Sequence, residues 1–442
     1  MNRITYSLLL YLLTPLIIVR LLWRGVKARE YLSRWGERFG VYGIYSATSK
    51  AKQKSIKLWI HTVSVGEFIA TVPLLEHLLN DKSNYNLRAD ELLITTTTPT
   101  GSARVVEFLN RFSAHHVYLP YDQPGAVNRF LKNYQPLVGV IMETELWPNL
   151  FHSCAKRNIP VLLANARLSQ RSQDGYKRWI PKLAYESLQS VTSIMAQSQD
   201  DAKRIVALGA DSEKVVITGS IKFDMQLPDD IEAQGEKLRR ELGGERPVWI
   251  AASTREGEDE QILAAHKIIL DSVSDALLIL VPRHPERFNS VAKLVKKLEF
   301  KLQRRSIAGD NCSCADDVQV YLGDTMGELL QLYSAADIAY VGGSLVATGS
   351  HNMLEPAALG KPVLFGPHRF NFADISKMLL EQEAAYEVLN HTELANRVIF
   401  LAQNSDTACQ MGERGRLVVE KNRGALKRLL VEVYKVLKLK LV

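Results

Sequence analysis

Short apolar runs alternate with helical patterns along almost the whole chain, and this alternation is the feature that most restricts the fold. Each run has the length and composition of a strand that is buried on both faces, as in LVGVIM at 137–142. Strands that alternate with helices are typical of a parallel sheet with crossover helices. We therefore predict an α/β fold. The expected strands lie at 57–65, 91–98, 115–120, 137–142, 159–166, 193–198 and 215–220, and then at 247–253, 277–282, 318–323, 338–343 and 362–366.

A polar stretch with glycines and prolines, LPDDIEAQGEKLRRELGGERP, separates the two series of strands. With 442 residues the chain exceeds the size at which a single core keeps growing, so two domains are expected. The predicted parts are an N-terminal segment at 1–40, a first domain at 41–228, a second domain at 229–404 and a C-terminal helix at 405–442 that packs back towards the first domain. Two such domains predict a cleft, with ligands at the carboxyl ends of the strands.

The N-terminus combines an apolar segment with a basic flank. Sixteen uncharged residues, ITYSLLLYLLTPLIIV, lie between Arg3 and Arg20, and as a helix they would span roughly 24 Å, less than the ~30 Å of a bilayer core. Basic residues that follow an apolar run favour the cytoplasmic side for the rest of the chain. We predict a membrane anchor or a shallow docking helix, and a buried first helix of a soluble domain is the alternative.

Composition excludes several other classes of protein. The four cysteines are too sparse for a disulfide framework, and the Cys312-Ser-Cys314 pair lacks the spacing of a zinc site. The chain has no GxxxxGK[ST] loop, and its basic residues form no stripe that would favour nucleic acid. We therefore expect no structural metal, no cofactor and no nucleic-acid partner. The acidic pairs at 200–201, 229–230 and 316–317 are expected to be solvated.

Candidate catalytic residues follow three strands of the first half. Glu67, in the segment Ser64-Val65-Gly66-Glu67, opens a helix and could take a proton from a hydroxyl, or it could only complement the helix dipole. Glu143 and Glu145 follow another strand in a βα loop, where functional residues concentrate, although a helix-start role is the alternative. Lys222 follows the last strand and could offset negative charge on a substrate, or it could be a solvated surface cation.

The second half offers groups suited to a nucleotide. Arg283 follows Pro282 after a buried strand and carries the planar donor fork that matches phosphate. Gly327 enters a helix, and the glycines at 342–343 lead into another helix at 351–356, which predicts unpaired backbone N–H groups that face phosphate. Glu355 could accept hydrogen bonds from ribose hydroxyls.

Eleven motifs, taken in order, resemble one family. They are HTVSVGE (61–67), TTTTPTGSARV (95–105), YLPYD (118–122), METELWPNL (142–150), NARLS (165–169), TGSIKFD (218–224), LVPRHPERF (280–288), GDTMGELLQLY (323–333), VGGSLV (341–346), HNMLEP (351–356) and GPHRFNF (366–372). The family is the 3-deoxy-D-manno-octulosonic acid (Kdo) transferases of lipopolysaccharide biosynthesis. The resemblance runs from the apolar N-terminus to the last helix. This chain departs from the family at Met353, where the family often has proline.

The resemblance implies a GT-B fold, with two Rossmann-like domains that face each other across a cleft. It implies transfer of Kdo from CMP-Kdo to lipid IVA, a lipid A precursor, on the cytoplasmic face of the inner membrane. The general base of the family falls on Glu67, and its proposed transition-state stabilisers fall on Glu143 and Lys222. The residues that it implies for CMP binding are Pro282, Arg283, Met326, Gly327, Glu328, Asn352, Met353, Leu354 and Glu355.

The expected reaction is a direct, inverting displacement that releases CMP. Because CMP-Kdo carries one phosphate, a metal ion is less necessary than for a diphosphate donor, in agreement with the missing Asp-x-Asp motif. Two other functions stay open on the sequence. One is a sugar-nucleotide epimerase of the same fold, and the other is a non-enzymatic binder at the membrane surface.

Overall fold

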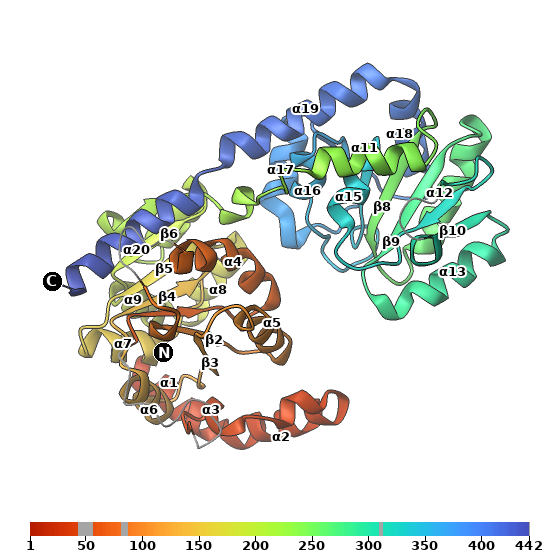
Figure 1. The fold of residues 1–442 in the computed structure, drawn as a ribbon. Helices are drawn as coiled ribbons and strands as arrows, with labels where there is room; N and C mark the ends of the chain where they lie inside the picture. Colours follow the sequence, from red (N-terminus) through yellow and green to blue (C-terminus); the bar gives the residue numbers. More distant parts are fainter. Residues whose placement is uncertain (43–55, 81–86, 309–312, 442) are drawn as a thin grey trace. The chain divides into compact units, whose positions relative to one another are not determined.

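Two units make up the chain. The structure is a computed structural model that describes residues 1–442 except 43–55, 81–86, 309–312 and 442. Unit 1 comprises Met1–Met225 and Arg423–Val442, and unit 2 comprises Gln226–Asn422 (Figure 1). The first division therefore falls close to the boundary expected at 228. The C-terminal segment expected at 405–442 is shared, because its first part belongs to unit 2 and its last part to unit 1.

Unit 1 is built on a parallel sheet of seven strands in the order β3-β2-β1-β4-β5-β6-β7. The order is that of a doubly wound sheet, in which the chain starts at the centre and moves first to one edge and then to the other. The strands are β1 (Leu58–His61), β2 (Leu92–Thr96), β3 (His115–Tyr118), β4 (Val138–Met142), β5 (Val161–Ala166), β6 (Ser193–Ala196) and β7 (Val215–Ile217).

Helices cover both faces of this sheet. In β1, Leu58 and Ile60 point into one core cluster and Trp59 into the other, because successive side chains of a strand face opposite ways. The helices are α1 (Arg3–Leu12), α2 (Thr14–Lys27), α3 (Trp35–Arg38), α4 (Val65–Asn80), α5 (Pro99–Leu109), α6 (Pro124–Tyr134), α7 (Pro148–Lys156), α8 (Gln170–Trp179), α9 (Pro181–Gln189), α10 (Gln199–Val206) and α20 (Ala425–Leu441). Short 3₁₀ turns are η1 (Arg29–Leu32), η2 (Ala89–Glu91), η3 (Ser212–Lys214) and η4 (Ile221–Asp224).

Unit 2 repeats this architecture with a second parallel sheet of seven strands, in the order β10-β11-β9-β8-β12-β13-β14. In β8, Trp249 and Ala251 join one core cluster, while Val248 and Ile250 join the other. The strands are β8 (Val248–Thr254), β9 (Leu277–Pro282), β10 (Leu302–Arg304), β11 (Val320–Leu322), β12 (Ile338–Val341), β13 (Val363–Phe365) and β14 (Ala385–Glu387).

The helices of unit 2 also lie on both faces of its sheet (Figure 1). They are α11 (Ile231–Glu241), α12 (Asp259–Ser272), α13 (Phe288–Lys297), α14 (Arg305–Ala308), α15 (Leu329–Ala335), α16 (Leu354–Ala358), α17 (Ala373–Glu381), α18 (His391–Gln403) and α19 (Ser405–Asn422). Two 3₁₀ turns, η5 (Pro285–Arg287) and η6 (Phe370–Phe372), complete the unit.

Each of the expected strands is present, and two further strands were missed. These two, β10 and β14, are three residues long and lie at the edges of the second sheet, where their side chains are partly exposed. They therefore lack the continuous apolar run of a buried strand. The C-terminal helical pattern was also read as one helix, whereas it forms α19 and α20. Gly424 lies at the break with φ +91°, a conformation that favours glycine.

Asp224 joins the end of the first sheet to the start of α20. Its carboxylate accepts hydrogen bonds from Gly424 N–H at 2.5 Å and from Leu426 N–H at 2.6 Å. Two N–H groups of the first helical turn, which have no partner inside the helix, are thereby satisfied. The adjacent helix α20 supplies Leu429 and Val433 to the core on one face of the sheet. Asp224 therefore fixes the 3₁₀ turn η4, which carries Lys222, against α20.

We predict that Asp224→Ala lowers the free energy of unfolding by about 1–2 kcal/mol, because both N–H groups lose their acceptor. Urea denaturation followed by circular dichroism measures the change. Asp229→Ala, at an exposed position nearby, is the matched control and should leave the unfolding midpoint unchanged. Equal midpoints for the two variants would show that the carboxylate of Asp224 does not hold α20.

Candidate active site

Glu67 lies at the carboxyl end of β1, in the first turn of α4. Val63 N–H and the Ser64 hydroxyl donate to its two carboxylate oxygens at 2.8 and 2.9 Å. This is close to a capping box, so the helix-start role considered for Glu67 is present. A carboxylate has about four lone-pair sites, and these two bonds leave acceptor capacity for a substrate hydroxyl.

Two further glutamates gather around Glu67. Burial raises the pKa of Glu67, and so does the charge of Glu143, although hydrogen bonds from Val63 and Ser64 oppose the shift. Burial also raises the pKa of Glu145 to about 7, with the charges of Glu67 and Glu143 adding to the effect. The structure thus brings together Glu67 and Glu143, which were candidates, with Glu145. At neutral pH this edge of the sheet can both accept and donate protons.

The backbone at Glu143 is unusual for a residue with a side chain. Its φ is +58°, in the left-handed region, and its N–H donates to Ala164 O at 2.8 Å. Left-handed backbone at a residue other than glycine costs on the order of 1–3 kcal/mol and tends to persist at functional sites. The strained turn places Glu143 and Glu145 on the same short loop after β4. Both glutamates were considered from the sequence, but the family resemblance assigned a role to Glu143 alone.

Lys222 lies in η4, which packs against α4, the helix that carries Glu67. Its 3₁₀ turn is held from two sides. Asn165 at the end of β5 accepts a hydrogen bond from Ile221 N–H at 3.2 Å, and Asp224 caps α20. Lys222 is half-buried, so it is not the fully solvated cation that was the alternative. Its place beside α4 agrees with a position near the carboxylates.

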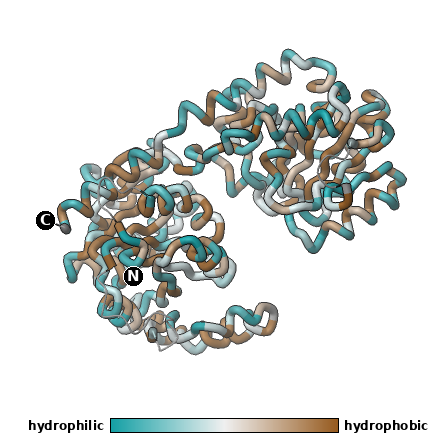
Figure 2. Tube along the Cα trace, in the orientation of Figure 1, coloured by the Kyte–Doolittle hydropathy of each residue, from teal (hydrophilic) through white to brown (hydrophobic). Residues whose placement is uncertain are grey.

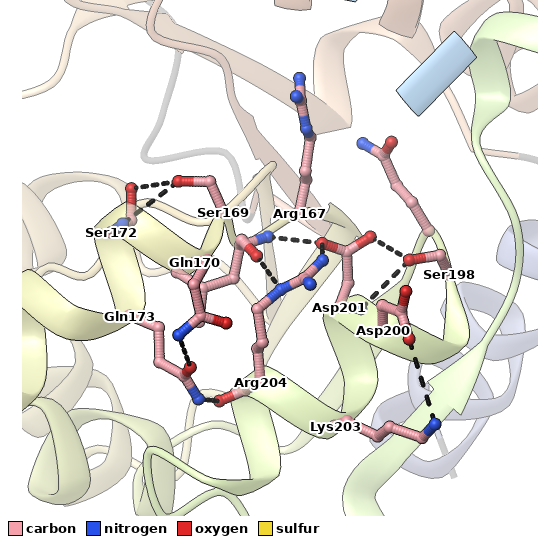
Figure 3. Close-up of polar contacts among 12 residues, drawn as sticks. Arg167, Ser169, Gln170, Ser172, Gln173, Ser198, Asp200, Asp201, Lys203 and Arg204 are labelled. Carbon is pink, nitrogen blue, oxygen red and sulfur yellow. Dashed lines mark hydrogen bonds and ion pairs between the residues drawn. The ribbon is translucent and has the colours of Figure 1, made fainter. Parts of the chain in front are cut away.

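A buried acid, Asp201, organises the neighbouring loop (Figure 3). It accepts hydrogen bonds from Leu168 N–H at 2.8 Å, from the Ser198 hydroxyl at 2.5 Å and from Arg204 at 3.2 Å. Asp201 is 2% exposed, so the expectation that the pair at 200–201 is solvated is wrong for this residue. In Figure 3 the side chain of Arg167 extends away from Asp201. The backbone N–H of Arg167 donates to the Thr144 hydroxyl at 2.9 Å. The network therefore supports the loop that carries Glu143 and Glu145.

The carboxyl edge of the sheet in unit 2 is basic instead of acidic. Burial lowers the pKa of Arg255, and the nearby charges of Arg283 and Arg287 lower it further. Arg255 donates to His351 Nε2 at 3.1 Å and also contacts His284. Arg283 is exposed, and its guanidinium forms no ion pair with a carboxylate among the described residues. Repulsion among these cations would be relieved by a bound anion. Sequence reasoning found Arg283 but missed Arg255, whose signal was its place directly after β8.

The glycine-rich turn at 342–344 does not offer the free N–H groups that were expected. The carboxylate of Glu258, which is fully buried, accepts hydrogen bonds from the backbone N–H groups of Gly343, Ser344 and Leu345 at 2.7–3.1 Å. The Tyr340 hydroxyl also donates to it at 2.6 Å. An internal carboxylate thus takes the place that sequence reasoning gave to phosphate. Its role is to shape the loop that carries His351.

Of the remaining nucleotide candidates, the side chains of Pro282, Met353 and Leu354 are buried in unit 2. Asn352 donates to Glu355 at 3.0 Å. Burial raises the pKa of Glu355, while the hydrogen bond from Asn352 and the charge of Arg283 oppose it.

A second part of the candidate nucleotide site precedes α15. Met326 is exposed, and Gly327 has φ +89° with open space where a Cβ would be. Glu328 is engaged with Arg305, which donates to it at 3.0 Å. Burial acts to raise the pKa of Glu328, but the hydrogen bonds from Arg305 and Thr325 hold it below its ordinary value. At this site the backbone around Gly327 is therefore more accessible to a ligand than the carboxylate.

The apolar N-terminus forms two helices that meet at an angle. Among the described residues, no helix by itself has the length and hydropathy of a membrane span, whereas α1 and Thr14–Val26 of α2 meet that criterion as a pair, with a bend of 51° between them. Both helices are hydrogen-bonded to the rest of unit 1: the Ser7 hydroxyl in α1 donates to Asn149 at 3.0 Å, and Gln123 donates to the Thr14 hydroxyl at the start of α2 at 2.6 Å. Hydrophobic residues recur along both helices (Figure 2).

Comparisons of the sequence with known proteins identify one family. A family model described as 3-deoxy-D-manno-octulosonic-acid transferase (kdotransferase) matches residues 33–225. The chain is 43% identical to a 3-deoxy-D-manno-octulosonic acid transferase of Haemophilus influenzae. The matched region covers 97% of this chain and 97% of that relative. The chain is 34% identical, over 97% of the chain and 98% of the relative, to the same enzyme of Bordetella pertussis. The crystal structure of UDP-GlcNAc 2-epimerase from Neisseria meningitidis covers 85% of the chain, and 98% of its own length is matched, with a TM-score of 0.56 and 14% identity. This last likeness concerns the fold alone.

We predict that Glu143→Gln lowers the pKa of Glu145 below about 7, because loss of a nearby negative charge favours the ionised carboxylate. Carbon-13 NMR of glutamate-labelled protein follows the titration, with Glu145→Gln to assign the signal. Glu76→Gln is the control, since Glu76 pairs with Arg111 and is not among the groups that act on Glu145. An unchanged titration of Glu145 in Glu143→Gln would contradict the carboxylate cluster.

Proposed function

The chain belongs to the 3-deoxy-D-manno-octulosonic acid transferase family, and on that premise we propose that it transfers Kdo from CMP-Kdo to lipid IVA with release of CMP. It is a glycosyltransferase of lipopolysaccharide biosynthesis. Two observations support the finer assignment: the sheet of unit 1 has a partly buried acidic edge suited to a hydroxyl acceptor, and the sheet of unit 2 has a basic edge suited to a nucleotide phosphate. The acceptor would bind unit 1 and the donor unit 2.

Glu67 acts as the general base in this proposal. Its carboxylate takes the proton of a lipid hydroxyl, whose oxygen attacks the anomeric carbon of Kdo. The bond from that carbon to the phosphate oxygen breaks, and CMP leaves with the electron pair. Attack and departure on opposite faces invert the anomeric configuration. The raised pKa of Glu67 supports the role, because a base is most effective when its pKa lies near the operating pH.

Positioned charges would stabilise the transition state. Lys222, beside α4, offsets negative charge near the sugar, and Glu143 acts on positive charge that develops at the anomeric centre. Arg283, with Arg255, receives the phosphate of CMP, and Glu355 accepts from a ribose hydroxyl. Because the leaving phosphate is a monoester that two arginines can neutralise, we propose that transfer needs no metal ion.

We also propose that α1 and α2 lie on the cytoplasmic face of the inner membrane. Their outer residues are exposed and apolar, with exposed fractions of 66% for Leu8, 61% for Val19 and 86% for Val26. Their inner sides are hydrogen-bonded to unit 1. A helix with one apolar and one engaged face is suited to an interfacial position. Such docking would hold the enzyme against an acylated acceptor.

We predict that Glu67→Gln lowers the rate of transfer to lipid IVA by about 10²–10⁴-fold, since the amide cannot take the proton. Mass spectrometry of the lipid product measures the rate. Glu76→Gln, on the same helix, should keep the rate of the unaltered enzyme, and so should addition of EDTA. Release of free sugar without a lipid product would contradict the proposal and favour an epimerase-like reaction.

We predict that Val19→Ser combined with Val26→Ser weakens binding to anionic vesicles by at least about tenfold, because two apolar side chains no longer enter the interface. Transfer to vesicle-borne acceptor should fall, whereas transfer to detergent-dispersed acceptor should stay constant. Val431→Ser with Leu439→Ser, at exposed positions of α20, is the control. Equal losses on both forms of the acceptor would show that these residues act through the fold.

A further inference from the structure

A cavity of about 320 Å³ lies at the amino edge of the sheet in unit 2, beside the first residues of β8 and β12 and the turn before β13. Helices α11, α12, α18 and α19 each contribute to its lining. The groups assigned to the nucleotide lie at the opposite, carboxyl edge of this sheet. Since β8 has seven residues, its two ends are separated by on the order of 20 Å. A ligand in this cavity would therefore bind apart from the reacting groups.

The walls of the cavity are apolar. Ile269 of α12 lines it, together with Val398, Leu401 and Ala402 of α18 and Ala408 of α19. Sites for small molecules are typically lined by hydrophobic side chains with a few placed polar groups, and their volumes begin at about 300 Å³. The cavity therefore has the size and the lining of a site for a small ligand with an apolar body.

One cation in the lining, Lys361, has no partner. It lies in the turn before β13, and its ammonium forms no hydrogen bond or ion pair with any residue that the structure describes. The side chain is half-buried, but its Nζ is not sealed off from solvent, so a ligand in the cavity can reach it. Burial lowers the pKa of Lys361, and although the charge of Asp337 opposes this shift, that of Arg239 adds to it. An anion beside the ammonium would offset the lost solvation.

The other charged groups of the lining limit the charge of that anion. Arg239 is already engaged, because it donates to three backbone carbonyl oxygens at 2.7–3.3 Å and to Asp337 at 3.0 Å. Asp337 also accepts from Val248 N–H at 2.8 Å, which holds its carboxylate at the amino end of β8. Both Asp337 and Glu245 are exposed at the edge of the cavity. With one unpaired cation and two carboxylates in the lining, a singly charged anion fits better than a doubly charged phosphate monoester.

Close packing of α19 against the turn before β13 brings Cys409 to the same cavity. A Cβ at Gly412 would overlap Gly360 O, so the helix can approach this turn because residue 412 is glycine. Cys409 lies one turn earlier in α19, and its thiol is free and exposed. Because Cys409 lines the cavity, its reactivity can report whether the cavity is occupied.

We propose that this cavity binds a monocarboxylic acid with an apolar body, of the class of medium-chain fatty acids. Its carboxylate pairs with the Lys361 ammonium, and its chain lies against the apolar wall that α18 provides. A neutral ligand would leave the ammonium unpaired, and an amine would meet it with like charge. None of the candidate catalytic or nucleotide residues is among the described residues that line the cavity, so the inference does not depend on the proposed transfer reaction.

Isothermal titration calorimetry of the full chain in neutral detergent, with octanoate as the probe, tests this proposal. Micelles take up a given probe to the same extent with every variant, so differences between variants report on the protein. We expect Lys361→Met to weaken the binding of octanoate by at least about tenfold and to leave the binding of octanol unchanged, because only the charged pair is lost. Lys293→Met, at an exposed position of α13 outside the cavity, is the control and should bind octanoate as the unaltered protein does.

Octanoate should also slow the alkylation of Cys409 by iodoacetamide, followed by peptide mass spectrometry. Ala402→Phe, which fills the cavity, should abolish the binding of octanoate, and melting temperatures check that each variant is folded. Absence of octanoate binding, equal affinity in Lys361→Met and the unaltered protein, or binding without protection of Cys409 would overturn the inference. Tighter binding of octylamine or octyl phosphate than of octanoate would also overturn it, since the cavity would then belong to an amine or a phosphate ester.

Discussion

The partial burial of three neighbouring glutamates at one edge of a parallel sheet is the constraint on which the proposed chemistry of this protein depends. Burial raises the pKa of Glu67 and of Glu145, and the negative charge of Glu143 raises both further. Such groups usually destabilise a fold. Here strands, a capping box and a left-handed turn at Glu143 hold them in place. A carboxylate that binds a proton more readily than an ordinary glutamate follows from that arrangement.

Unit 2 also gathers charged side chains at the carboxyl edge of its sheet, but there the charges are positive. Its sheet edge gathers Arg255, Arg283 and Arg287, and repulsion among these arginines favours a bound anion. The backbone N–H groups of the nearby loop already have an acceptor, because Gly343 and Ser344 donate to the buried carboxylate of Glu258. The loop at 343–345 is thus completed by a carboxylate of the protein itself, whereas the arginines at the sheet edge are the groups to which we assign the nucleotide phosphate under the proposed function.

Much of this organisation was predictable from sequence, and the failures have physical causes. Long apolar runs marked the buried strands, whereas β10 and β14 are short and half-exposed and gave no such signal. Glu67 was found because it follows a strand directly. The role of Glu258 was hidden, because its partners lie 85–87 positions away and only the folded sheet brings them together. Asp201 likewise looked like a solvated acid until the fold buried it. The fold is shared with an epimerase at 14% identity, so the activity rests on whole-length similarity to transferases.

The most direct test of the account is the pH dependence of kcat/KM for transfer, measured from about pH 4 to 9 with acceptor in detergent. The base must be ionised, so the rate should rise with pH. Because burial and Glu143 raise the pKa of Glu67, the rise should come at a pH above the ordinary glutamate value. A rate that is already constant from the ordinary glutamate value upward would contradict the claim that a buried carboxylate in this cluster is the base.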